Sequence, residues 1–163
     1  ASKRLKTEES SAGLMPGESS AVMMISTKNE NNLSTIGRLE EISIEYADAG
    51  SFLDERDNGK AVSTSINNTL KNRQSFEGGF FYDINGSAMI NVSQEKRCFS
   101  YEYCCATSVG DVGTVFPLLS SIKAIQSYNR NYLLSNESIV VSTSPNGVAG
   151  SILVIGEELY GES

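Results

Sequence analysis

Apolar residues in the first third of the chain recur at helical spacing. Leu33, Ile36 and Leu39 follow one another at intervals of three, which predicts a helix over 34–49. A competing pattern lies at the end of this segment, where apolar residues alternate with polar ones as in a strand: Ile42, Ile44 and Tyr46. We favour the helix, with Gly50 ending it, and expect a second short helix over 60–72.

The first twenty residues carry no such pattern. Residues 1–20 are small and polar and are interrupted by Gly13, Pro16 and Gly17, so we expect a flexible or partly helical stub. The remaining residues, 21–163, are enough for one core and too few for two. The chain therefore reads as a stub followed by a single globular domain.

The middle of the chain changes to strand patterns. Phe80 to Ile84 form an apolar run, Asn85-Gly86 is a strong hairpin signal, and 88–92 returns. Asn-Gly suits a type I′ turn because both central positions need positive φ. These residues predict an antiparallel hairpin.

The C-terminal part combines one helix with a second hairpin. Pro117 suits the first turn of a helix, and apolar residues continue at helical spacing to Asn129. Residues 138–143 and 151–156 are apolar runs joined by a Ser-Pro-Asn-Gly turn. The predicted class is α+β, with an N-terminal helical segment followed by antiparallel β-hairpins and one inserted helix.

Charge and composition exclude several partners. The 20 acidic residues exceed the 13 basic ones, and the longest basic cluster is Lys3-Arg4-Leu5-Lys6, so no basic face for nucleic acid is present. No apolar run reaches the length needed to span a membrane. A surface rich in Ser, Asn and Thr, without Trp or His, suits an extracellular or cell-surface protein.

Candidate catalytic chemistry is sparse. The sequence has no histidine, which removes Ser-His and Cys-His nucleophile pairs and imidazole metal sites. The phosphate-binding loop pattern is absent, and Asp54 to Gly59 lacks the acidic alternation of a calcium loop. We therefore expect no enzyme activity, no catalytic residue, no cofactor and no metal.

Three cysteines lie close together in sequence. Cys98 is followed by the adjacent pair Cys104 and Cys105, which would point to opposite faces of a strand. One interpretation is three buried thiols. The other is a structural disulfide from Cys98 to either Cys104 or Cys105.

Tyrosines gather in the same region. Tyr82, Tyr101 and Tyr103 are candidates for a binding face, because tyrosine offers broad apolar contact with a polar tip. Packing in the core is the default role for these rings, and a binding face is the alternative.

The order of these segments resembles the periplasmic part of a type IVb-like pilin. The similar features are the segment STIGRLEEISIEYADAGSF as helix and loop, Gly78-Gly79 opening a strand, and a polar stretch before Cys98. The resemblance covers residues 30–155 and implies subunits that pack into a filament without catalysis. The assembly helix of such pilins is missing, so any membrane contact would run through a segment absent from this chain.

The sequence thus favours a non-enzymatic, secreted assembly or cell-adhesion protein, above all a pilus (fimbrium) filament subunit that self-assembles. The alternatives are a viral or phage structural protein and a carbohydrate-binding surface domain.

Overall fold

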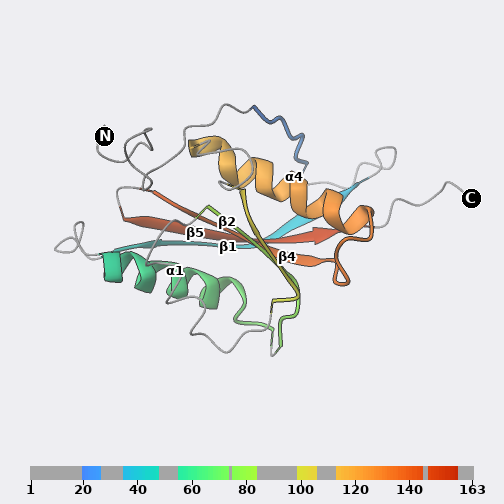
Figure 1. The fold of residues 1–163 in the computed structure, drawn as a ribbon. Helices are drawn as coiled ribbons and strands as arrows, with labels where there is room; N and C mark the ends of the chain where they lie inside the picture. The colour runs from blue at the N-terminus through green and yellow to red at the C-terminus, as the bar shows by residue number, and fades with distance from the viewer. Residues whose placement is uncertain are drawn as a thin grey trace, which may run out of the picture.

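One mixed sheet between two helices forms the body of the domain (Figure 1). The computed structural model of the protein describes residues 20–26, 35–47, 55–73, 75–83, 99–105, 113–144 and 147–157. The strands are β1 (Gly37–Tyr46), β2 (Gly79–Tyr82), β3 (Tyr101–Cys104), β4 (Glu137–Thr143) and β5 (Val148–Gly156). The helices are α1 (Glu55–Thr69) and α4 (Phe116–Asn129), and a 3-10 turn (Gly113–Val115) leads into α4.

The strands lie in the order β1-β5-β4-β2-β3. β2 pairs in parallel with β3 on one side and with β4 on the other. β5 is antiparallel to both of its neighbours, β4 and β1. Four of the five strands therefore point the same way, and β5 runs against them.

The two helices cover opposite faces because their connections cross the sheet in opposite directions. The chain passes from β1 through α1 to β2, and later returns from β3 through α4 to β4. Crossovers between strands that point the same way are almost always right-handed, so a reversal of direction moves the helix to the other face. In Figure 1, α4 lies above the sheet and α1 below it.

Each helix packs over its own apolar cluster. On the α1 face, Val62, Ile66 and Leu70 pack against side chains that include Phe80 and Leu153. On the α4 face, the cluster consists of Phe81, Cys105, Phe116, Ala124, Ile125, Leu133, Val140 and Val154. Alternate residues of β2, β4 and β5 supply the two clusters, as expected for strands buried on both faces.

The predicted fold class is wrong in its arrangement. The segment expected to be a helix over 34–49 contains strand β1. Its residues pair with β5 along the whole strand, and this pairing with a distant segment outweighs the local preference for a helix. The predicted antiparallel succession also fails, since both neighbours of β2 are parallel to it. The hairpin expected at Asn85-Gly86 and the stub, apart from Ser20, lie outside the described residues.

Other expectations are confirmed. The helix predicted from Pro117 to Asn129 is α4, in which proline occupies the first turn. The second hairpin is β4 and β5, closed by backbone hydrogen bonds between Ser144 and its neighbours Gly147 and Val148. The second short helix, expected over 60–72, is α1, which begins earlier, at Glu55, and ends earlier, at Thr69.

Candidate functional site

The carboxyl ends of four strands meet at one edge of the sheet. In sheets of this kind, ligands bind beyond the carboxyl ends of strands that point the same way, where connections leave in opposite directions. Here the polar residues at that edge are Asp83 after β2, Cys105 after β3, and Ser142 and Thr143 at the end of β4. This edge is therefore the first candidate for a functional site.

The carboxylate of Asp83 ties two strands together. Its Oδ2 accepts a hydrogen bond from Ser142 Oγ at 2.7 Å, and its Oδ1 accepts one from the backbone N–H of Thr143 at 3.0 Å. The backbone N–H of Asp83 donates to Val141 O at 3.4 Å. Both carboxylate oxygens are thus engaged in joining β2 to β4, which is a structural role.

The thiol of Cys105 is buried beneath α4. Its side chain is 2% exposed, and burial raises its pKa, as do the neighbouring Cys104 and, less strongly, Asp83. The hydroxyl of Ser120 and the ammonium of Lys123 act in the opposite direction and are outweighed. A thiol with a raised pKa stays protonated at neutral pH and is a poor nucleophile.

The structure describes two of the three cysteines, Cys104 and Cys105. Cys98 lies outside the described residues, so its bridge to Cys104 or Cys105 stays a prediction. Within the part of the chain that the structure describes, no disulfide forms.

The three candidate tyrosines do not share a face. Tyr101 and Tyr103 lie on the α4 face with their rings stacked, 6.5 Å apart at 9°, and Lys123 Nζ lies 5.7 Å from the Tyr103 ring centre. Tyr82 lies on the α1 face and stacks on Phe80 at 4.9 Å. Partial burial, followed by the nearby Cys104 and Glu102, raises the pKa of Tyr82.

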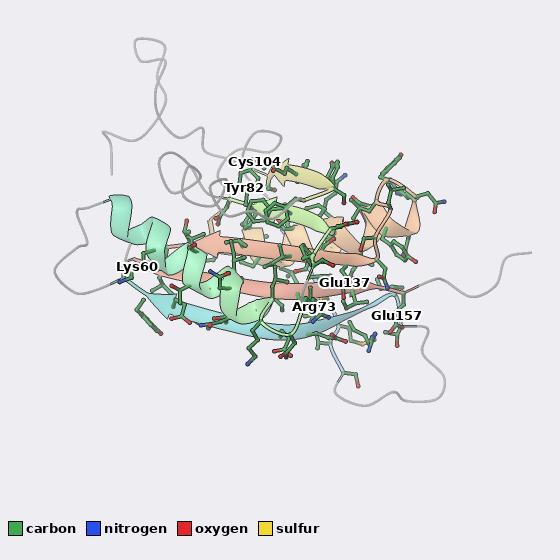
Figure 2. The ribbon with its side chains drawn as sticks, turned by 90° about the horizontal axis from the view of Figure 1, so that it is seen from below. Lys60, Arg73, Tyr82, Cys104, Glu137 and Glu157 are labelled. Atoms are coloured by element: carbon green, nitrogen blue, oxygen red, sulfur yellow. The ribbon has the colours of Figure 1, made fainter. Side chains whose placement is uncertain are left out.

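Figure 2 shows Tyr82 and Cys104 beside one another, as their pairing in β2 and β3 requires. All three tyrosines are half-buried against core residues. The structure therefore brings Tyr101 and Tyr103 together and separates them from Tyr82. Their surroundings favour packing, the default role expected from the sequence.

A chain of ion pairs occupies the opposite end of the sheet on the α1 side (Figure 2). Glu137 pairs with Arg73 at 2.9 Å, Arg73 with Glu40 at 3.4 Å, and Glu40 with Arg38 at 3.1 Å, which in turn pairs with Glu157 at 2.8 Å. The Arg73 side chain is only 20% exposed, so its pairs are the best shielded. The network fastens β1, β4 and the end of α1, and sequence spacing gave no sign of it.

An exposed apolar surface lies on the α4 face of β1. Ile42, Ile44 and Tyr46 are 68%, 58% and 74% exposed, because α4 packs on β5, β4 and β2 and leaves this later part of β1 uncovered. Beside them on β5 lie the half-buried Ile152 and Val148, which pair with Ile42 and Tyr46. We call these five residues the β1 strip. The alternation of Ile42, Ile44 and Tyr46 was its signal in the sequence.

Metal and membrane features are lacking in the described ranges. No three Cys, Asp or Glu side chains there gather closely enough to hold a metal ion. Neither α1 nor α4, the helices of those ranges, combines the length and apolar character needed to cross a membrane.

Comparison with known proteins gives a likeness of fold. No known protein family and no curated protein matches the sequence. Among solved structures, the chain is similar to one from a complex of a type II PKS acyl-carrier protein with its ketosynthase bound to the hexaketide, with a TM-score of 0.57 and 12% identity. The match covers 75% of this chain and 34% of that one, so this chain spans about a third of its length.

The expectation of a pilus-type filament subunit is wrong by this comparison. A solved structure that shares the fold belongs to a PKS complex, and the helix that the pilin resemblance implied over 34–49 is replaced by β1. The viral and carbohydrate-binding alternatives gain nothing from the match. That chain is held with a protein partner, which agrees with the general expectation that this one has protein partners.

Proposed function

We propose that this chain is a non-catalytic protein-binding domain that works as one subunit of a protein complex. The β1 strip is the observation that carries the proposal. Three large side chains on one face of one strand are each more than half exposed: Ile42, Ile44 and Tyr46. Contiguous apolar surface of this kind marks protein contact sites.

The residues at the carboxyl ends of the parallel strands support a non-catalytic role. The carboxylate of Asp83 is occupied by hydrogen bonds from β4, and the thiol of Cys105 is buried with a raised pKa. General base catalysis or nucleophile activation needs the reverse, a group free to take a proton or a thiol with a lowered pKa. The sequence has no histidine to supply that proton acceptor.

The fold comparison suggests which class of protein to consider. The similar chain comes from a complex of a carrier protein and a ketosynthase. We infer that subunits of multi-protein assemblies are the appropriate partners for this domain. Its extracellular location stays a prediction from composition.

A thioester challenge tests the absence of catalysis. The purified chain is incubated with the acetyl thioester of N-acetylcysteamine, and its intact mass is measured. We expect no acyl adduct at Cys105, because its protonated, buried thiol does not attack the thioester carbonyl. Stoichiometric acylation of Cys105, located by peptide mass, with release of the small thiol, would overturn the non-catalytic assignment.

Binding is tested with a matched pair of variants. Ile44→Lys places a charge in the β1 strip, whereas Ile36→Lys changes the same residue type at a 51% exposed position just before the same strand. Proteins retained by the chain are identified and then purified for reconstitution. We expect a stoichiometric complex, including self-association, that Ile44→Lys weakens and Ile36→Lys leaves intact. If the chain forms neither a complex with another protein nor a complex with itself, the proposal is refuted.

A further inference from the structure

The β1 strip has a shape that can fit a second copy of itself. Ile44 projects from β1, and directly beside it in the paired strand is Gly150. A Cβ added to Gly150 would meet only Ser43 O, at 3.9 Å, so the space over this glycine is open. Ile152 and Val148 stand on either side of Gly150 along the same face of β5.

A knob and a hole thus lie next to each other on one surface. In an interface between identical chains with twofold symmetry, each patch must complement itself. An axis that passes between Ile44 and Gly150 places the Ile44 of each copy over the Gly150 of the other. The two contacts of this symmetric dimer would use only Ile44 and the open space over Gly150, which every copy has.

Packing through the face is favoured over pairing through the free edge of β1. A bulge at Glu41, whose φ is 21°, interrupts the regular ladder of the strand. The polar side of β1 also carries Glu41 and Glu45, and pairing two such edges would bring like charges together. Bulges and charges are the devices by which edge strands avoid pairing with other chains.

We propose that the β1 strips of two copies pack face to face about a twofold axis to form a weak dimer. The inference rests on the proposed function, since it names the partner of the same surface. The strip side chains Ile42, Ile44 and Tyr46 offer roughly 400 Å² of apolar area, within the range of the largest patch on a typical monomer. Stable complexes bury about 800 Å² on each partner, so this contact forms a dimer only at high protein concentration.

The net charge gives the dimer a distinctive dependence on salt. Each copy carries a net charge of −7, and the strip itself has no ionisable group apart from the Tyr46 hydroxyl. Added salt screens the repulsion between the two copies without weakening an apolar contact. The dimer therefore becomes tighter as the salt concentration rises, whereas a contact between opposite charges becomes weaker.

Sedimentation velocity over the micromolar to millimolar range tests the proposal on the full chain. We expect a dimer that tightens with sodium chloride, is lost in Ile44→Lys and is unchanged in Ile36→Lys. Gly150→Val fills the hole from the monomer side, where an added Cβ meets nothing nearer than 3.9 Å, and should weaken the dimer about tenfold or more. Circular dichroism melts of each variant report whether the fold is retained.

Several outcomes would overturn the inference. They are a monomer at every concentration and salt level, a dimer that tolerates both Ile44→Lys and Gly150→Val, and a dimer that salt weakens. A monomer that binds a different protein through Ile44 also overturns the dimer, but leaves the proposed function standing. If the strip binds neither its own copy nor another protein, both fail.

Discussion

Three buried hydroxyl groups between α1 and the sheet offer a sharp test of how this fold is held. Ser151 Oγ on β5 lies 2.7 Å from Ser65 Oγ and 2.6 Å from Thr69 Oγ1, and all three side chains are at most 3% exposed. Ser65 also donates to Ser43 O at 3.2 Å, and Thr69 reaches Ser151 O at 3.4 Å. The cluster is therefore fully hydrogen-bonded, with Ser151 at its centre.

Replacing Ser151 with alanine removes two of these hydrogen bonds at once. Each contributes about 1 kcal/mol, and both partners keep a backbone acceptor, so we expect a loss of about 2 kcal/mol in the free energy of unfolding. For a chain of this size, that corresponds to a fall in Tm of roughly 4–8 °C. Urea unfolding followed by circular dichroism should give a lower midpoint with an unchanged slope.

A double-mutant cycle separates the network from general packing. Thr69→Val keeps the side-chain shape and removes one hydroxyl, which should cost about 1 kcal/mol. The double variant should cost about 1 kcal/mol less than the sum of the two single changes, because both remove the same Thr69–Ser151 bond. Additive effects, or a cost for Ser151→Ala below about 0.5 kcal/mol, would refute this reasoning.

Further predictions concern close packing, the buried thiol and one turn. A Cβ at Gly156 would clash with the ring of Tyr128, so Gly156→Ala should destabilise the fold by about 1–3 kcal/mol in urea. Gly150→Ala, with nothing nearer than 3.9 Å, serves as the neutral control on the same strand. Cys105 should react with iodoacetamide only after denaturation, and full alkylation of the native protein at neutral pH would contradict its burial. Because the pKa of Cys105 is raised above its ordinary 9.0, the native state holds the thiol proton more tightly than the unfolded state does. The stability that this proton contributes is complete below about pH 9 and is lost as the pH rises through the raised pKa. Cys105→Ala should therefore flatten the loss of stability at alkaline pH. Gly147 has a φ of 76°, and Gly147→Val should cost about 1–3 kcal/mol in thermal unfolding, more than Gly147→Asn, whose side chain tolerates that conformation.

The parts of the fold that the sequence predicted are those with strong local signals. Pro117 fixed the start of α4, because proline suits the first turn of a helix. The apolar runs of β4 and β5, with glycine in the turn between them, specified a hairpin, which needs only neighbouring residues to form. Local chemistry was sufficient in both places.

Strand β1 shows why the rest was missed. Its residues fit both a helical spacing through Leu39 and a strand alternation through Ile42 and Ile44, and the choice is made by β5, which lies more than one hundred residues further along the chain. The parallel pairing of β2 with β3 and β4 is equally non-local. Single-sequence patterns do not report such partners, because they describe each segment alone.

The candidate site likewise has features that local sequence patterns indicate and features that depend on contacts between distant segments. The alternation of Ile42, Ile44 and Tyr46 was visible in the sequence, but the helix was favoured over it, and the exposure of these residues depends on where α4 packs. The separation of Tyr82 from Tyr101 and Tyr103 follows from the parallel register of β2 and β3, which spacing did not give. The ion pairs around Arg73 join residues far apart in the chain, so only the folded arrangement shows them.

The interior position of β5 also has a consequence for how the domain is made. β5 leaves the ribosome after the other four strands of this sheet, yet it separates β1 from β4 in the finished sheet. Until it emerges, β1 has no backbone partner in that sheet, and pairing it requires closure of a loop of more than one hundred residues, which is slow. The sheet is therefore completed only after β5 has been synthesised. Before that point β1 lacks the strand that it pairs with, which makes the nascent chain a natural client for chaperones.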